Sequence, residues 1–175
     1  LNLNIVYTLP LFREQQRFVV RVLGGWETPG IISYGSGLPL TAATINVDPG
    51  GLGLLVGGGP ARPDYVSNPN QGAPHQLRNW FNKNAFALVP SGQYRPGEAP
   101  VGNIMGPGYQ TWDLSLFKNV RMTEGSNFQL RAEAFNTFNH TNFSAVSSTL
   151  GNSNYGQVTS AGQARVLQLA AKVSF

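Results

Sequence analysis

Hydrophobic and polar residues alternate along the final stretch of the chain. One parity is apolar and comprises Leu167, Leu169, Ala171, Val173 and Phe175. The other parity carries polar or small side chains, namely Gln168, Ala170, Lys172 and Ser174. Because strand side chains point alternately to two faces, this pattern predicts a strand over 164–175 with one apolar and one polar face. A half-buried strand of a soluble protein and a strand of a membrane barrel both show such alternation.

The same alternation recurs in four earlier segments. We therefore predict five strands, at about 1–9, 26–41, 109–121, 128–139 and 164–175. Segments of this length, about 9–11 residues, are long enough to cross a bilayer as barrel strands. The predicted fold class is all-β, an antiparallel meander of about five transmembrane strands from a larger barrel. Its outer face should carry the apolar residues that share parity: Leu3, Ile5, Leu114, Leu130, Leu167, Leu169 and Val173.

Charged residues in the best of these strands lie on the polar parity, with one exception. Arg131, Glu133 and Lys172 alternate with apolar neighbours, whereas Lys118 shares the parity of Leu116. A long lysine side chain can bury its stem and place its ammonium in a wet interface. Lys118 therefore either lies at a membrane interface or marks a break in its strand.

The connections between the predicted strands differ in length. A short helix is expected at 15–23 and a tight turn at 123–127, whereas the connections 42–108 and 144–163 are long. If the terminal strand runs inward, both long connections face the outside, which is the usual arrangement in outer-membrane barrels. We expect 42–108 to lie on that side, to lack a core of its own and to form a short helix around 76–82, because Pro and Gly recur without sustained periodicity.

Aromatic residues are expected near both ends of the strands, where rings prefer the headgroup level of a membrane. The expected inner girdle comprises Tyr7, Trp26, Phe128 and Phe175. The expected outer girdle comprises Trp112, Phe138 and Phe143. The same rings could instead fill the core of a soluble protein.

Composition narrows the classes further. The chain has 175 residues, no cysteine and only 11% charged residues, with 21 Gly and 12 Pro. The 41% hydrophobic content argues against disorder, while no apolar run reaches the roughly 18 residues of a membrane-spanning helix. The net charge of +4 comes from scattered residues, so we expect no nucleic-acid partner. Because five strands cannot close a barrel, we expect the sequence to be a piece of something longer.

No motif of catalysis or cofactor binding withstands inspection. The glycine-rich run 50–59 lacks the Lys-Ser/Thr of a phosphate loop, and Ser36 lacks the flanking pattern of a hydrolase nucleophile. His75 and His140 are far apart, without a carboxylate at ligand spacing. Asp113 and Glu133 are explained more simply as polar lumen residues. We therefore expect no enzyme activity, no metal and no cofactor.

Several short runs resemble one family of outer-membrane proteins. They are 106–108 (GPG), 112–118 (WDLSLFK), 130–136 (LRAEAFN) and 138–143 (FNHTNF), and related runs extend over almost the whole chain. They resemble the C-terminal part of TonB-dependent receptors, in particular the Oar-like kind with an N-terminal carboxypeptidase-regulatory-like domain. The resemblance implies a plugged barrel of about 22 strands that takes up a scarce nutrient with energy delivered through TonB. The plug, the TonB-contacting segment and most strands would lie outside these residues.

The resemblance also suggests two sets of functional residues. An apolar terminal strand that ends on an aromatic resembles the signal read by the barrel-assembly machinery, which here would comprise Leu167, Leu169, Val173 and Phe175. Amides and aromatic rings cluster in a candidate ligand-contacting rim formed by Asn136, Phe138, Asn139, Asn142 and Phe143. The rim could equally be a strand-to-loop transition, because Asn tolerates turn conformations. We favour that structural explanation.

Two hypotheses follow. The leading one is an outer-membrane receptor that imports a siderophore, oligosaccharide or similar nutrient, with lipid, the assembly machinery, further barrel strands, a plug and the TonB complex as partners. The alternative is a soluble secreted β-sandwich that acts as a binding or adhesion module. In a sandwich the apolar faces pack on each other, whereas in a barrel they face lipid.

Overall fold

The computed structural model describes residues 1–10, 24–45, 61–122 and 125–175. The expected helix at 15–23, the glycine-rich run 50–59 and part of the turn at 123–127 lie outside these residues. The described chain forms two compact units. We call them the sheet unit, which comprises Leu1–Gly35, Tyr109–Thr141 and Gln163–Phe175, and the loop unit, which comprises Ser36–Gly108 and Asn142–Gly162. None of the described helices is long and apolar enough to span a membrane.

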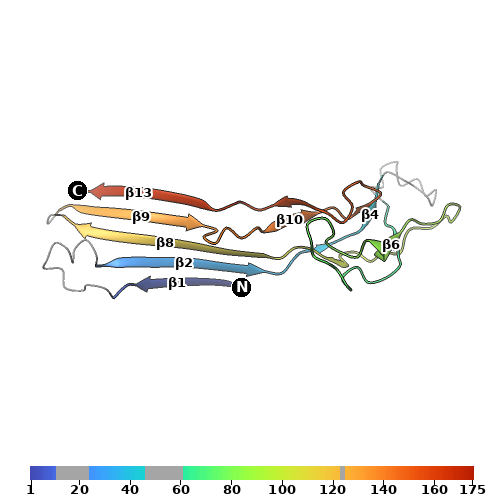
Figure 1. The fold of residues 1–175 in the computed structure, drawn as a ribbon, viewed down its shortest axis with the longest axis horizontal. Coiled ribbons are helices and arrows are strands. Elements are labelled where there is room, and N and C mark those ends of the chain that lie inside the picture. Colours follow the sequence, from blue (N-terminus) through green and yellow to red (C-terminus); the bar gives the residue numbers. More distant parts are fainter. Residues whose placement is uncertain (11–23, 46–60, 123–124) are drawn as a thin grey trace. The chain divides into compact units, whose positions relative to one another are not determined.

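The sheet unit contains one antiparallel sheet of five strands in the order β1-β2-β8-β9-β13 (Figure 1). The strands are β1 (Asn2–Thr8), β2 (Trp26–Gly35), β8 (Tyr109–Arg121), β9 (Asn127–Phe135) and β13 (Val166–Ser174). Each strand pairs with the sheet strand next to it along the chain, so the predicted all-β antiparallel meander is confirmed. The bounds of β8 match the predicted segment 109–121.

Two predicted strands end four or more residues early, for local backbone reasons. The segment 26–41 is divided, because β2 ends at Gly35 and Pro39–Leu40 form a separate short strand, β3. At Gly37 a Cβ atom would collide with the backbone of Gly106, so the chain there passes against another backbone rather than along the sheet. The segment 128–139 ends early, because Asn136 has a φ of 49°.

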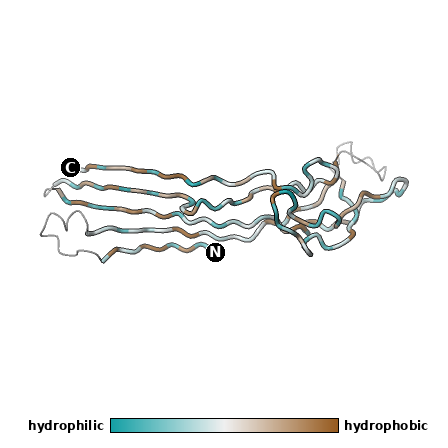
Figure 2. Tube along the Cα trace, in the orientation of Figure 1, coloured by the Kyte–Doolittle hydropathy of each residue, from teal (hydrophilic) through white to brown (hydrophobic). Residues whose placement is uncertain are grey.

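Register places the predicted apolar residues on one face of the sheet. A single row crosses all five strands through Ile5, Gly30, Leu114, Ala134 and Leu167. Directly paired residues of neighbouring strands lie on the same face. By the same register, the seven predicted outer residues share this face, which we call the apolar face. Figure 2 shows the alternation of hydrophobic and hydrophilic residues along these strands.

The apolar face is open to its surroundings. Ile5, Leu167 and Leu169 are 44%, 69% and 81% exposed, respectively. Among the described residues, no second sheet packs on the five-stranded sheet. A β-sandwich would bury these side chains in its core. The exposed apolar face therefore argues against the β-sandwich alternative and is typical of a sheet that contacts the hydrocarbon of a membrane.

Lys118 does not interrupt its strand. β8 continues through this residue, which pairs with Trp26 on β2 and with Leu130 on β9. The Lys118 Nζ atom lies 5.8 Å from the centroid of the Trp26 ring, and the residue is only 6% exposed. The stem of Lys118 is thus covered, and its ammonium lies over an aromatic ring. This arrangement favours a position at a membrane interface over a break in the strand.

The loop unit contains short strands. They are β3 (Pro39–Leu40), β4 (Ala43–Thr44), β5 (Asp64–Tyr65), β6 (Phe86–Ala87), β7 (Ile104–Met105), β10 (Phe143–Val146), β11 (Thr149–Leu150) and β12 (Val158–Ala161). They form four two-stranded pairs: β3 with β7, β5 with β6, β10 with β12, and β4 with β11, the last of which is parallel. One 3-10 helix, η1, spans Lys83–Ala85.

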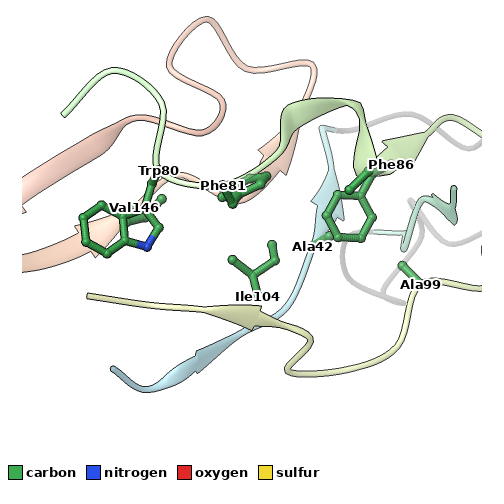
Figure 3. Close-up of a cluster of buried hydrophobic side chains, with 8 residues drawn as sticks. Ala42, Trp80, Phe81, Phe86, Ala99, Ile104 and Val146 are labelled. Carbon is green, nitrogen blue, oxygen red and sulfur yellow. The ribbon is translucent and has the colours of Figure 1, made fainter. Parts of the chain in front are cut away.

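The prediction that 42–108 lacks a core is wrong. The loop unit buries a cluster of apolar residues, drawn in Figure 3, that comprises Ala42, Trp80, Phe81, Ala85, Phe86, Ala99, Ile104 and Val146. Phe81 and Ile104 are 1% and 0% exposed. The Phe81 ring packs edge-on against Phe86 and Tyr155, with centroids 6.3 and 5.3 Å apart. The core escaped prediction because each contributing segment is too short to show a period.

The predicted helix at 76–82 is also wrong. Gln76 and Asn79 instead form a tight turn closed by two backbone hydrogen bonds, of 3.0 and 3.1 Å. The helical turn begins after Asn82, whose side-chain oxygen accepts a hydrogen bond from the Asn84 N–H. Asparagine favours such capping positions, so the helix starts at the cap rather than before it.

Candidate functional site

The apolar face carries a shallow hollow at its centre. Small residues, Gly30, Ala132 and Ala134, lie among larger ones such as Leu114 and Leu167, and together they border a volume of about 710 Å³. The Leu114 side chain leans over Gly30, since a Cβ atom there would lie 2.8 Å from its Cδ2. The surface of this hollow is mostly apolar. It is suited to lipid tails.

Aromatic rings lie toward both ends of the strands. Trp26 begins β2 at one end, and Tyr7 and Phe128 lie within two residues of the ends of their own strands. At the opposite end, Trp112 and Phe138 pack edge-to-face with their centroids 5.5 Å apart. These positions agree with the predicted girdles, apart from Phe143, which belongs to the loop unit.

The opposite face of the sheet is polar and internally hydrogen-bonded, and we call it the polar face. Gln129 donates from Nε2 to Asn119 Oδ1 at 2.8 Å and accepts from Arg131 Nε at 2.9 Å. The Arg131 guanidinium lies 4.7 Å from the centroid of the Phe117 ring. These contacts run across β8 and β9 and hold polar side chains in fixed orientations.

Asn136, the first residue of the predicted rim, is a structural turn residue. It is 7% exposed, and its N–H donates to Asp113 Oδ1 at 2.8 Å. Its Nδ2 atom donates to the His140 and Gln163 carbonyls at 2.9 and 3.2 Å, and its Oδ1 accepts from the His140 N–H at 2.9 Å. The amide is thus occupied by the turn itself, as the structural explanation expected.

The remaining rim residues are divided between the two units. Asn139 has a φ of 52° and accepts from the Arg165 N–H at 3.0 Å, while Phe138 is 66% exposed. Asn142 and Phe143 belong to the loop unit, where the Phe143 ring packs edge-to-face on Trp80 at 5.9 Å. A ligand-contacting role remains a prediction that these contacts do not test.

The predicted assembly-signal residues lie along β13. Leu167, Leu169 and Val173 point to the apolar face, and Phe175 follows the last strand residue with its side chain fully exposed. On one side β13 pairs with β9, and on the other it pairs with no strand among the described residues. The recognition role itself remains a prediction.

The loop unit holds an ion pair that sequence reasoning missed. Both terminal nitrogens of Arg95 donate to the Asp64 carboxylate at 2.7 Å. The hydrogen bond from Arg95 holds the pKa of the Asp64 carboxyl below its ordinary value. Elsewhere in the same unit, burial raises the pKa of Tyr155 to about 12, so its hydroxyl stays protonated. The pair lies 31 residues apart in sequence, and no local pattern signals it.

The residues considered for catalysis have structural partners. His75 packs edge-on against Trp80 with centroids 5.0 Å apart, and Asp113 caps the turn at Asn136. In the described parts of the chain, no group of three or more His, Asp or Glu side chains is placed to hold a metal ion.

Comparison with known families identifies the architecture. A family model described as an outer membrane beta barrel domain matches residues 1–168, a range that includes β1, β2, β8 and β9 and the start of β13. The searches of curated proteins and of solved structures found no match. The family match, the exposed apolar face and the polar opposite face agree that the sheet lies in an outer membrane. The chain belongs to the outer membrane β-barrel domain family.

Proposed function

We propose that this chain is part of an outer-membrane receptor that takes up a nutrient, such as a siderophore or an oligosaccharide, by TonB-coupled active transport. One observation supports the proposal most directly. Both long connections begin and end at the same end of the sheet: one runs from Gly35 to Tyr109 and the other from Phe135 to Val166. Together they form a unit with its own core. A packed unit on the external connections suits the capture of a specific ligand better than loose loops would.

The orientation is part of the proposal. The loop unit would face the outside, and the opposite strand ends, with the turn after Arg121 and the end of β13, would face the periplasm. Long external loops and short periplasmic turns are the rule for bacterial barrels.

The edges of the sheet call for further strands. β1 and β13 each have one edge without a partner among the described residues, and an open edge in hydrocarbon leaves backbone groups unsatisfied. We propose that both edges pair with further strands of the full-length receptor. The plug and the TonB-contacting segment would likewise be supplied by regions other than this chain.

The terminal strand would serve assembly. Phe175 would lie near the membrane interface, where even a charge costs little stability. Its removal should therefore impair recognition by the assembly machinery rather than the stability of the assembled barrel. We expect its deletion to lower the fraction of receptor with heat-modifiable gel mobility. Ligand binding by the molecules that do assemble should be unchanged.

Uptake by cells that express the full-length receptor tests the function. Ferric siderophores and oligosaccharides are supplied one at a time as the sole source of iron or carbon, with and without a working TonB. Phe81→Ala, which opens the core of the loop unit at a cost of about 3–5 kcal/mol, should abolish uptake without reducing membrane insertion. The control Leu88→Ala removes a side chain that is 48% exposed in the same unit.

The outcomes separate the alternatives. Uptake that requires both TonB and an intact loop unit supports the proposal. Uptake that persists without TonB would identify a passive pore. Binding of a ligand at the cell surface without any import would identify a receptor that only binds.

A further inference from the structure

Two cationic side chains border a hollow on the polar face of the sheet. The hollow has a volume of about 230 Å³ and is lined by Gln129, Arg131, Ala170 and Lys172. Register pairs Gln129 with Lys172 and Arg131 with Ala170 on β9 and β13. The two cations are therefore diagonal neighbours on one face, within mutual reach of a single small ligand.

The Arg131 guanidinium is oriented before any ligand arrives. Its Nε atom donates to Gln129 Oε1, and its plane is supported by the Phe117 ring. Gln129 is in turn fixed by its bond to Asn119. Among the described residues, the terminal nitrogens of Arg131 have no hydrogen-bond acceptor, and Arg131 is one of the residues that line the hollow. Such a fixed fork matches the two oxygens of a carboxylate or phosphate.

Among the described residues, no ion pair neutralises the positive charge beside the hollow. The carboxylates of the same face nearest in register are Glu133, two residues beyond Arg131, and Glu27, which pairs with Phe117. No ion pair joins Glu133 or Glu27 to Arg131 or Lys172 within 4.0 Å. Two unpaired cations on a concave wall raise the local concentration of anions.

We propose that Arg131 and Lys172, positioned with Gln129, form a binding site for a carboxylate or phosphate group on the inner wall of the barrel. Arg131 binds two oxygens of the group, and Lys172 contributes a mobile point charge from the neighbouring strand. The ligand is a small anion that enters the lumen. The site depends on the polar face lining the barrel interior, and it does not depend on TonB coupling.

Anion titration of the folded full-length receptor in detergent tests the site. Inorganic phosphate and citrate are titrated separately by calorimetry, and maltose serves as the neutral probe. We expect saturable binding of at least one anion and none of maltose. Lys172→Gln and Arg131→Gln should each weaken that binding by at least about fivefold, which corresponds to ~1 kcal/mol.

The matched control is Arg165→Gln. This change also removes one positive charge just before β13, but Arg165 does not line the hollow. It should leave the affinity unchanged at constant ionic strength. Heat-modifiable mobility checks that each variant folds. If Arg131→Gln does not fold, the affinity of Lys172→Gln for the anion alone decides whether the site exists.

Three results would overturn the proposal. They are the absence of anion binding to the wild-type receptor, binding that neither substitution weakens, and an equal loss in the Arg165→Gln control. Failure of nutrient uptake with intact anion binding would count against the proposed transport function alone.

Discussion

Asn136 ends β9 in a backbone conformation that few residues adopt. Replacement by Ala removes three side-chain hydrogen bonds to His140 and Gln163 and places at a φ of 49° a residue that lacks the local hydrogen bonds by which Asn tolerates this conformation. With about 1 kcal/mol for each of the three lost bonds and about 1 kcal/mol for the left-handed backbone, Asn136→Ala should destabilise the folded receptor by about 4 kcal/mol. Urea unfolding in lipid vesicles measures the loss. Asn136→Gly, which tolerates the backbone, should recover about 1 kcal/mol of it.

The ion pair of Asp64 and Arg95 should make the loop unit sensitive to acid. The pKa of Asp64 is lowered in the folded state, so its contribution to stability is complete above the ordinary value of 3.8 and is lost as the pH falls through the lowered value. Hydrogen exchange of segments 61–65 and 93–99 in the receptor should therefore be slower in the wild type than in Asp64→Asn at neutral pH. The two should converge once the pH falls below the lowered pKa of Asp64. Glu27→Gln, which removes a carboxylate from the sheet unit, is the control and should leave exchange of these segments unchanged. A difference between wild type and Asp64→Asn that persists in strong acid would contradict the linkage.

The two faces of β13 should respond oppositely to the same new charge. Leu169 lies on the apolar face and is 81% exposed, whereas its neighbour Gln168 lies on the polar face. Leu169→Arg should destabilise the barrel by about 2–4 kcal/mol, because it places a guanidinium in hydrocarbon. Gln168→Arg should change stability by less than about 0.5 kcal/mol. Unfolding of both variants in vesicles measures the difference, and equal effects would mean that the apolar face does not meet lipid.

Long periodic elements were predictable from the sequence, and the loop unit was not. β8 could be located because apolar and polar residues alternate along this 13-residue strand. The strand continues through Lys118, although that residue departs from the alternation. The core around Phe81 and Ile104 depends on strands as short as two residues, in which no period can be recognised. The turn role of Asn136 was predictable from its residue type, but its particular partners are set by chain segments that meet only in the fold.

The orientation of the whole receptor can be tested with inserted epitopes. Gly92 and Gly125 both have open space where a Cβ atom would lie, so an insertion at either should be tolerated. An epitope at Gly92 should bind antibody on intact cells. An epitope at Gly125 should bind only after the outer membrane is made permeable. The reverse pattern would invert the proposed topology without affecting the assignment of the two faces.

The parallel pairing of β4 with β11 has a consequence for timing. The hydrogen bond from Ser148 Oγ to the Thr41 carbonyl joins residues 107 positions apart, and Val146 completes a core begun at Ala42. Contacts of such long range form slowly, because loop closure must precede any gain from packing. Because Ala42, Trp80, Phe81 and Phe86 are synthesised well before Val146, these core residues cannot complete their packing until Val146 has been made. The loop unit should therefore complete its core only after Val146 has been synthesised.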